Sequence, residues 1–263
     1  MANALSRLLV AAVGIPIVLG AVYLGGWWFF SLLAVAAAVA LHEFWLLARP
    51  VSPLAPAGYV GGLVALAGAE LGGAIWMVGG ALTTFALAFL LKGISEVRQS
   101  ATASISATVM GAVWIGVGLS FFILLRDLPQ DGRLATYTLL LAVWAGDTFA
   151  YAGGRLLGRH KLAPATSPSK TWEGFLFGTA ATMFVAFVTL YKQDFLTIAE
   201  SIVLGAVLAV AGPLGDLFES LLKRDMQVKD TGRLLGGHGG VLDRIDALLF
   251  AAPAAYFCIL AFR

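Results

Sequence analysis

The stretch SISATVMGAVWIGVGLSFFILL, residues 104–125, contains no charged side chain. A helix needs about 20 apolar residues to cross a hydrocarbon layer of roughly 30 Å. Backbone polar groups in lipid must be satisfied within the segment itself, which makes a helix the expected conformation. The stretch therefore predicts a helix that spans a membrane.

The rest of the chain has the same character. Of its 263 residues, 60% are hydrophobic and 12% are charged, whereas about a quarter of the residues of a soluble domain are charged. We therefore expect residues 1–263 to form one membrane domain, an all-α polytopic transmembrane helical bundle. We predict nine spans, or eight if the short third segment does not cross. They cover residues 5–24, 27–48, 57–71, 74–91, 104–125, 135–157, 172–191, 195–222 and 242–262.

The basic residues predict the orientation of these spans. With the N-terminus in the cytoplasm, only four of the 17 Lys and Arg residues, namely Arg126, Arg133, Lys192 and Arg263, fall on the outer side. An excess of Lys and Arg in cytoplasmic loops is typical of membrane proteins. We expect an integral protein of the cytoplasmic (inner) membrane. The net charge of +2, with no block of five or more like charges, argues against a nucleic-acid partner.

Two predicted cytoplasmic loops hold most of the unusual polar residues. One covers residues 155–173, and the other is KRDMQVKDTGRLLGGHGGVLDRID, residues 223–246. Because both lie on the same side, one site built from both, facing the cytoplasm, is the simplest hypothesis. Residues 1–130 are then mainly scaffold, and residues 135–263 supply the catalytic helices and loops.

Five carboxylates lie inside or at the ends of apolar segments in this second half. A carboxylate in lipid costs at least about 2.5 kcal/mol and normally faces a polar cavity with a partner. Carboxylate oxygens are the donors that Mg²⁺ prefers, and the single Cys and three His residues have no zinc-ligand spacing. We predict one or two Mg²⁺ ions near these residues, which are Asp147, Asp216, Glu219, Asp243 and Asp246.

Basic and glycine-rich segments adjoin these carboxylates. Lys170, Lys223, Arg224, Lys229 and Arg233 offer donors to anionic oxygens. Residues 236–240, GGHGG, lead into the last helix, whose N-terminal amides favour phosphate. Glycine-rich turns also occur as plain hinges, and that interpretation stays open.

The remaining polar residues have two interpretations each. Ser167, Lys170 and Thr171 are candidate nucleotide contacts, while Ser169 or Thr171 could instead cap the helix that follows. His238, between paired glycines, is as easily a substrate contact as a loop residue. His42 and Glu43 are interpreted as a pair at the membrane interface.

The polar segments contain six motifs, which are Asp147-x-x-Ala150-Tyr151, residues 158–164 (GRHKLAP), Ser167-Pro168-x-Lys170-Thr171-x-Glu173-Gly174, Ser220-x-x-Lys223-Arg224, Lys229-Asp230-x-Gly232 and His238-Gly239-Gly240-x-x-Asp243-Arg244-x-Asp246. Together these motifs resemble those of the phosphatidate cytidylyltransferases, or CDP-diacylglycerol synthases, of the bacterial type. The similarity covers roughly residues 144–246, with Gly236 where many members have proline.

The resemblance implies a reaction and a set of site residues. CTP and phosphatidic acid would give CDP-diacylglycerol and pyrophosphate in phospholipid biosynthesis, with Mg²⁺ required. Asp216, Asp243 and Asp246 would bind the metal and, with Lys223, form the catalytic set. The implied substrate-binding residues are Asp147, Ser167, Lys170, Thr171, Arg224, Lys229, Asp230, His238, Gly239, Gly240 and Arg244.

Other functions compete with this interpretation. A CTP-using enzyme acting on another lipid, such as a polyprenol kinase or an archaeal-lipid cytidylyltransferase, would carry similar chemistry. A cation-coupled transporter is disfavoured because the charges lie near one face and no internal repeat is evident. Glycine-rich helix faces make a homodimer plausible.

Overall fold

The computed structural model describes residues 2–95, 100–228, 231–232 and 239–263, with no side-chain description for residues 2–10. The chain is predominantly helical, as the sequence predicts. The helices are α1 (Ala2–Leu24), α2 (Gly26–Leu47), η1 (Arg49–Val51), α3 (Ala55–Gly93), α4 (Ala101–Gly111), η2 (Ala112–Val117), α5 (Gly118–Arg126), α6 (Gly132–Leu157), α7 (Trp172–Leu190), α8 (Ile198–Asp225) and α9 (Leu242–Ala261). The prediction of an all-α fold is confirmed, apart from a two-stranded antiparallel hairpin of β1 (Lys161–Ala163) and β2 (Ser167–Thr171).

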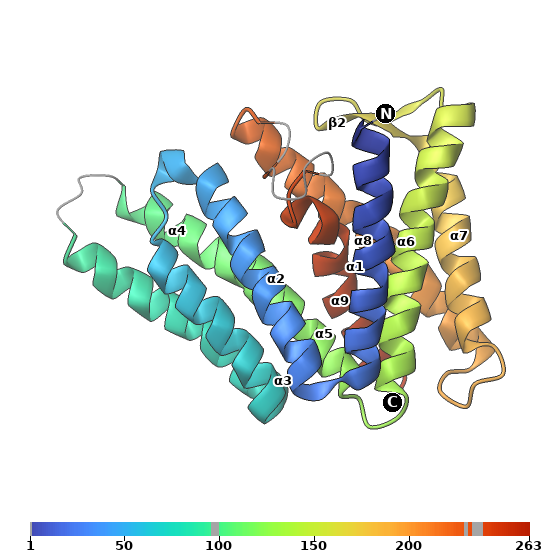
Figure 1. The fold of residues 1–263 in the computed structure, drawn as a ribbon, viewed down its shortest axis with the longest axis horizontal. Helices are drawn as coiled ribbons and strands as arrows, with labels where there is room; N and C mark the ends of the chain where they lie inside the picture. Colours follow the sequence, from blue (N-terminus) through green and yellow to red (C-terminus); the bar gives the residue numbers. More distant parts are fainter. Residues whose placement is uncertain (1, 96–99, 229–230, 233–238) are drawn as a thin grey trace. The chain divides into compact units, whose positions relative to one another are not determined.

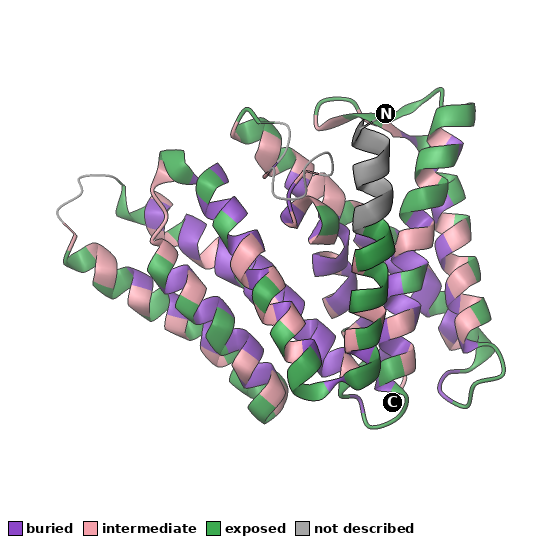
Figure 2. Ribbon diagram, in the orientation of Figure 1, coloured by how far each residue is buried: buried purple, intermediate pink, exposed green. Residues whose placement is uncertain are grey.

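The side chains on the helix surfaces are those of a membrane protein. Large apolar residues such as Ile75 and Phe184 are exposed, at 86% and 66%, and exposed positions recur along the length of α3 (Figure 2). Buried hydroxyls such as those of Thr84 and Ser120 donate to the carbonyl four residues earlier in their own helix, which satisfies them without water. Six helices in the described part of the chain are long and apolar enough to cross a membrane. The count of nine spans and the orientation of the N-terminus remain predictions.

The chain divides into two compact units. The first comprises residues 1–124 and 226–245, and the second comprises residues 125–225 and 246–263.

In the first unit, α3 is a hairpin of two helices rather than one long helix (Figure 1). Gly73, at φ 73° and ψ −158°, breaks the helical conformation, a backbone geometry that glycine adopts readily. The two arms touch through small residues, since a Cβ on Gly80 would meet the backbone of Ala65 and one on Gly68 would meet that of Trp76. The separate helices predicted at residues 57–71 and 74–91 are therefore present.

In the second unit, α6 and α7 pack closely in antiparallel directions. A Cβ on Gly178 would lie 2.9 Å from the Ala150 side chain and from the carbonyl oxygen of Gly146, and one on Gly153 would meet the ring of Phe177 at 2.7 Å. Small residues allow membrane helices such close approach. The β hairpin connects the end of α6 to the start of α7, and so holds residues 161–171 at one end of this helix pair.

The α3 hairpin yields a stability prediction with a control one residue away. Gly80→Ala places a methyl group against the Ala65 backbone, and overpacking of this kind costs about 1–3 kcal/mol. Gly79→Ala meets nothing within 4 Å. In thermal unfolding of detergent-purified protein, Gly80→Ala should lower Tm, whereas Gly79→Ala should leave it equal or higher. Equal Tm values for the two variants would contradict the close packing of the arms.

Candidate active site

Two lysine–carboxylate pairs lie near the end of α8 in the second unit. Lys170 Nζ, on β2, lies 2.8 Å from Asp216 Oδ2 on α8. One turn later, Lys223 Nζ lies 2.7 Å from Glu219 Oε2, and the Glu219 side chain is 1% exposed. The structure thus brings together three predicted site residues, Lys170, Asp216 and Lys223. Each ammonium group neutralises one carboxylate, which would otherwise be costly to remove from water.

A third carboxyl group, that of Asp246 on α9, joins the same cluster. Asp246 is 8% exposed, and its carboxyl group interacts with the charge of Glu219 and of Asp216. The backbones approach closely as well, because a Cβ on Gly215 would meet the main chain of Asp246 and Ala247. Asp216 and Asp246, two of the three predicted metal ligands, are therefore neighbours within this unit.

Asp216, Glu219 and Asp246 offer the hard oxygen donors that suit Mg²⁺. Within the described ranges, however, no three Asp, Glu, His or Cys side chains converge as a metal site. The donor chemistry fits a divalent cation, and the present geometry is that of carboxylates partly engaged by lysines.

The loop at residues 158–171 is held against the same end of α8. Arg224 Nε donates to the carbonyl oxygen of Thr166 at 3.1 Å, in addition to the Lys170–Asp216 pair. Glu173 accepts from the backbone N–H groups of Arg159 and His160 and lies 2.6 Å from His160 Nδ1. These contacts give Arg224 and Lys170 fixed places beside the carboxyl cluster.

Thr171 has the capping role that the sequence left open. Its hydroxyl accepts from the backbone N–H of Gly174 at 3.1 Å, at the start of α7. Ser167 begins β2 and is partly buried. A nucleotide contact by Ser167 or Thr171 remains a prediction.

In the first unit, Asp243 holds the loop that precedes α9. Its carboxylate accepts from the backbone N–H of Gly240 at 2.7 Å and from that of Thr231 at 3.2 Å. Gly239 has a φ of 77°, and a Cβ there would lie 2.6 Å from Asp243 Oδ2. Asp243 therefore accepts hydrogen bonds from the backbone of Thr231 and Gly240, and its part in metal binding stays a prediction.

Glu43 on α2 is a residue of this loop region that the sequence interpretation missed. It is 3% exposed, and its two carboxylate oxygens accept from the backbone N–H groups of Val241 and Leu242 at 3.0 and 2.8 Å. His42 instead faces Tyr59, with 3.1 Å between Nδ1 and the hydroxyl oxygen. The missed signal is a carboxylate inside an apolar span, the feature that singled out Asp147.

Of the five other predicted site residues, the structure describes two, Asp147 and Arg244. Asp147 is exposed on α6 and lines a small cavity of about 30 Å³ with residues of α7 and α8 such as Thr179 and Gly212. Arg244 is exposed on the first turn of α9. Lys229, Asp230 and His238 lie outside the described residues.

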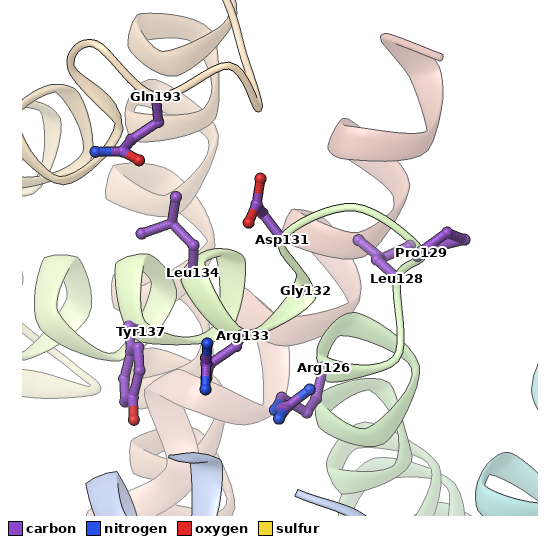
Figure 3. Close-up of a pocket in the computed structure, with 9 residues that line it drawn as sticks. All are labelled: Arg126, Leu128, Pro129, Asp131, Gly132, Arg133, Leu134, Tyr137 and Gln193. Atoms are coloured by element: carbon purple, nitrogen blue, oxygen red, sulfur yellow. The ribbon is translucent and has the colours of Figure 1, made fainter.

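A larger cavity, of about 580 Å³, lies at the beginning of α6, the end opposite the β hairpin (Figure 3). Its lining includes Arg126, Asp131, Arg133, Tyr137 and Gln193. None of the predicted site residues that the structure describes is among its lining residues. The predicted chemistry belongs to the other end of α6.

Comparison with known proteins identifies the family. The chain matches the model of the cytidylyltransferase family over residues 5–262. A phosphatidate cytidylyltransferase of Staphylococcus haemolyticus is 39% identical over 171 residues, which cover 64% of this chain and 65% of that protein. Enzymes of the same name from Bacillus subtilis and Synechocystis are 37% and 31% identical, covering 69% and 96% of this chain and 68% and 95% of their own lengths. The chain is therefore a member of the cytidylyltransferase family.

Proposed function

We propose that the protein is a membrane nucleotidyltransferase that condenses CTP with phosphatidic acid to give CDP-diacylglycerol and pyrophosphate. The observation that carries the proposal is the cluster of Lys170, Asp216, Glu219, Lys223 and Asp246 in a chain that matches the cytidylyltransferase family along nearly its whole length. An oxygen of the lipid phosphate would attack the α-phosphorus of CTP. The bond from the α-phosphorus to the bridging oxygen would break, and pyrophosphate would leave.

The lysine–carboxylate pairs supply the groups that such a transfer needs. Phosphoryl and nucleotidyl transfers depend mainly on positioning and on neutralising charge. Lys170 and Lys223 are already desolvated, at 21% and 14% exposed side chain. We infer that, when the substrates bind, these ammonium groups leave Asp216 and Glu219 and form ion pairs with the substrate phosphates. Arg224, which is fixed beside Thr166, would add a third donor.

We further propose that Asp216 and Asp246 would hold Mg²⁺ once the lysine side chains have bound the substrate phosphates. The ion would supply charge neutralisation at the α-phosphate and at the leaving pyrophosphate. Glu219, a buried member of the same cluster, would hold Lys223 near the site until the substrates bind. The role of Asp243 as a further ligand, and a second metal ion, stay predictions of the sequence.

The expected location of the reaction is the inner membrane, with the site at its cytoplasmic face. CTP would arrive from the cytosol and phosphatidic acid from the leaflet. A homodimer also remains an expectation. Many glycine contacts, such as those of Gly68 and Gly80, serve packing within the chain.

The activity is tested with CTP labelled at either the α or the γ phosphate. Purified protein with Mg²⁺ and phosphatidic acid should transfer the α label, and not the γ label, to a chloroform-soluble product. Transfer of the γ label to a polyprenol would instead indicate a kinase, and product only with an archaeal-type lipid would indicate a different cytidylyltransferase. Either result would contradict the proposal.

The carboxyl cluster is tested by isosteric substitution. Asp246→Asn and Asp216→Asn should each lower turnover at least about 100-fold while the protein remains folded, because each removes a charge proposed to face the metal. Asp194→Asn, at an exposed site in the turn after α7, is the matched control and should be fully active. EDTA should abolish turnover and added Mg²⁺ restore it. Normal turnover by Asp246→Asn would count against the site.

Orientation is tested by cysteine labelling. The native Cys258 is first replaced by Ser, and a cysteine is then placed at Gln227, an exposed position after α8. We expect a membrane-impermeant maleimide to label this cysteine in inverted vesicles and not in intact cells. Labelling from outside intact cells would place the site on the wrong side.

A further inference from the structure

We propose that Glu43 is a positioning residue for the proposed transfer: from α2, it holds Val241, Leu242 and thus the first turn of α9 in position. The effect of Glu43 on turnover rests on the proposed function. Its effect on the backbone at Val241 and Leu242 does not. Residues 1–130 carry no motif of the family resemblance, and the sequence alone marks them as scaffold. The contacts of Glu43 connect this half of the chain directly to Val241 and Leu242, just after the His-Gly-Gly motif.

The first support is a two-point hydrogen bond. Glu43 Oε1 accepts from Val241 N and Oε2 from Leu242 N. The first N–H groups of a helix have no partner within the helix, and a negative charge at that end is also favoured by the helix dipole. A single carboxylate that receives two consecutive amides fixes both the position and the direction of the first turn of α9.

The second support is the space around the carboxylate. A Cβ on Gly240 would lie 2.6 Å from Glu43 Cδ, and one on Gly232 would lie 2.8 Å from the same atom. Gly232 ends the Lys-Asp-x-Gly motif and Gly240 ends the His-Gly-Gly motif. A side chain at either position would have to displace the Glu43 carboxylate, which fills the space that it would need.

The third support is that Asp243 binds backbone amides next to those that Glu43 binds. Gly240 and Thr231, which flank the glycine loop, donate to Asp243, while the next two amides donate to Glu43. The backbone from Gly240 to Leu242 is thus held by one carboxylate from α9 itself and by one from α2. Asp246 follows Asp243 by one turn of the same helix, so Glu43 can act on the proposed reaction without touching a substrate.

The test begins with Glu43→Gln, which keeps the shape and loses the charge. One amide must then face an NH₂ group in place of an oxygen. Since a hydrogen bond to a charged group contributes more than a neutral one, turnover should fall about tenfold or more. The matched control is Glu200→Gln. Glu200 accepts from the backbone N–H of Thr197 at 2.7 Å at the start of α8, so it also caps a helix, 16 residues before Asp216 in the sequence. It should keep wild-type turnover.

Hydrogen–deuterium exchange of the peptide containing Val241 and Leu242 gives a readout that does not need activity. Exchange should be slow in wild type and in Glu200→Gln, and faster in Glu43→Gln, at a Tm close to that of wild type. If wild type shows this protection yet makes no nucleotide lipid, the proposed function fails and the loop contact stands. Equal exchange in Glu43→Gln and wild type would overturn the inference, as would unchanged turnover.

A double-mutant cycle separates positioning from a general loss of stability. Gly232→Ala should be strongly impaired alone, because its methyl group meets the carboxylate. In a Glu43→Ala background the space is open, so adding Gly232→Ala should cost little further turnover. Strict additivity of the two losses would contradict the direct contact. Gly232→Ala also tests the contact on its own if Glu43→Ala does not fold, since wild-type turnover by that variant would overturn the inference.

Discussion

A carboxylate at membrane depth must find hydrogen-bond donors or a cation, and this requirement organises the polar part of the molecule. Glu43 meets it with two backbone amides of α9. Asp216 and Glu219 meet it with Lys170 and Lys223. Each of these groups has a specific partner, as expected for carboxylates within or beside apolar helices. The partners are loop amides and lysines, the groups that a phosphate-handling site uses.

The same constraint connects the two halves of the sequence in one chemical scheme. The second half supplies the lysines and the buried carboxyl cluster. The first half supplies Glu43, which fixes the start of the helix that carries Asp243 and Asp246. A chain with 12% charged residues places an acidic group of its second helix against the start of its last helix, 198 residues later. The first half is therefore more than a set of lipid-facing spans.

Much of the fold could be predicted because lipid imposes few solutions. Apolar length alone located the helices, including the two arms of α3 on either side of Gly73. The β hairpin before α7 was not predicted, since residues 161–171 contain two prolines and no alternating apolar pattern. The glycine contacts that pack α6 on α7 depend on which helices meet, and a single sequence does not state that.

The candidate site was predictable in residue types and less so in partners. Spacing along one helix relates Asp216 to Glu219 and Asp243 to Asp246. It could not reveal that Lys170 pairs with Asp216, since 46 residues separate them along the chain, or that Asp243 turns its oxygens to the backbone of Thr231 and Gly240. Thr171 was rightly given a capping alternative, because its position before an apolar helix is the usual one for a cap. Glu43 escaped because its donors are main-chain amides of a distant segment.

The central claim is that internal ion pairs hold the places of the substrate phosphates. A structure of the protein with CTP and Mg²⁺ tests it most directly. The account predicts that Lys170 Nζ leaves Asp216, now 2.8 Å away, to contact a phosphate oxygen, while the metal lies on Asp216 and Asp246. An intact Lys170–Asp216 pair, with the nucleotide bound elsewhere, would contradict it.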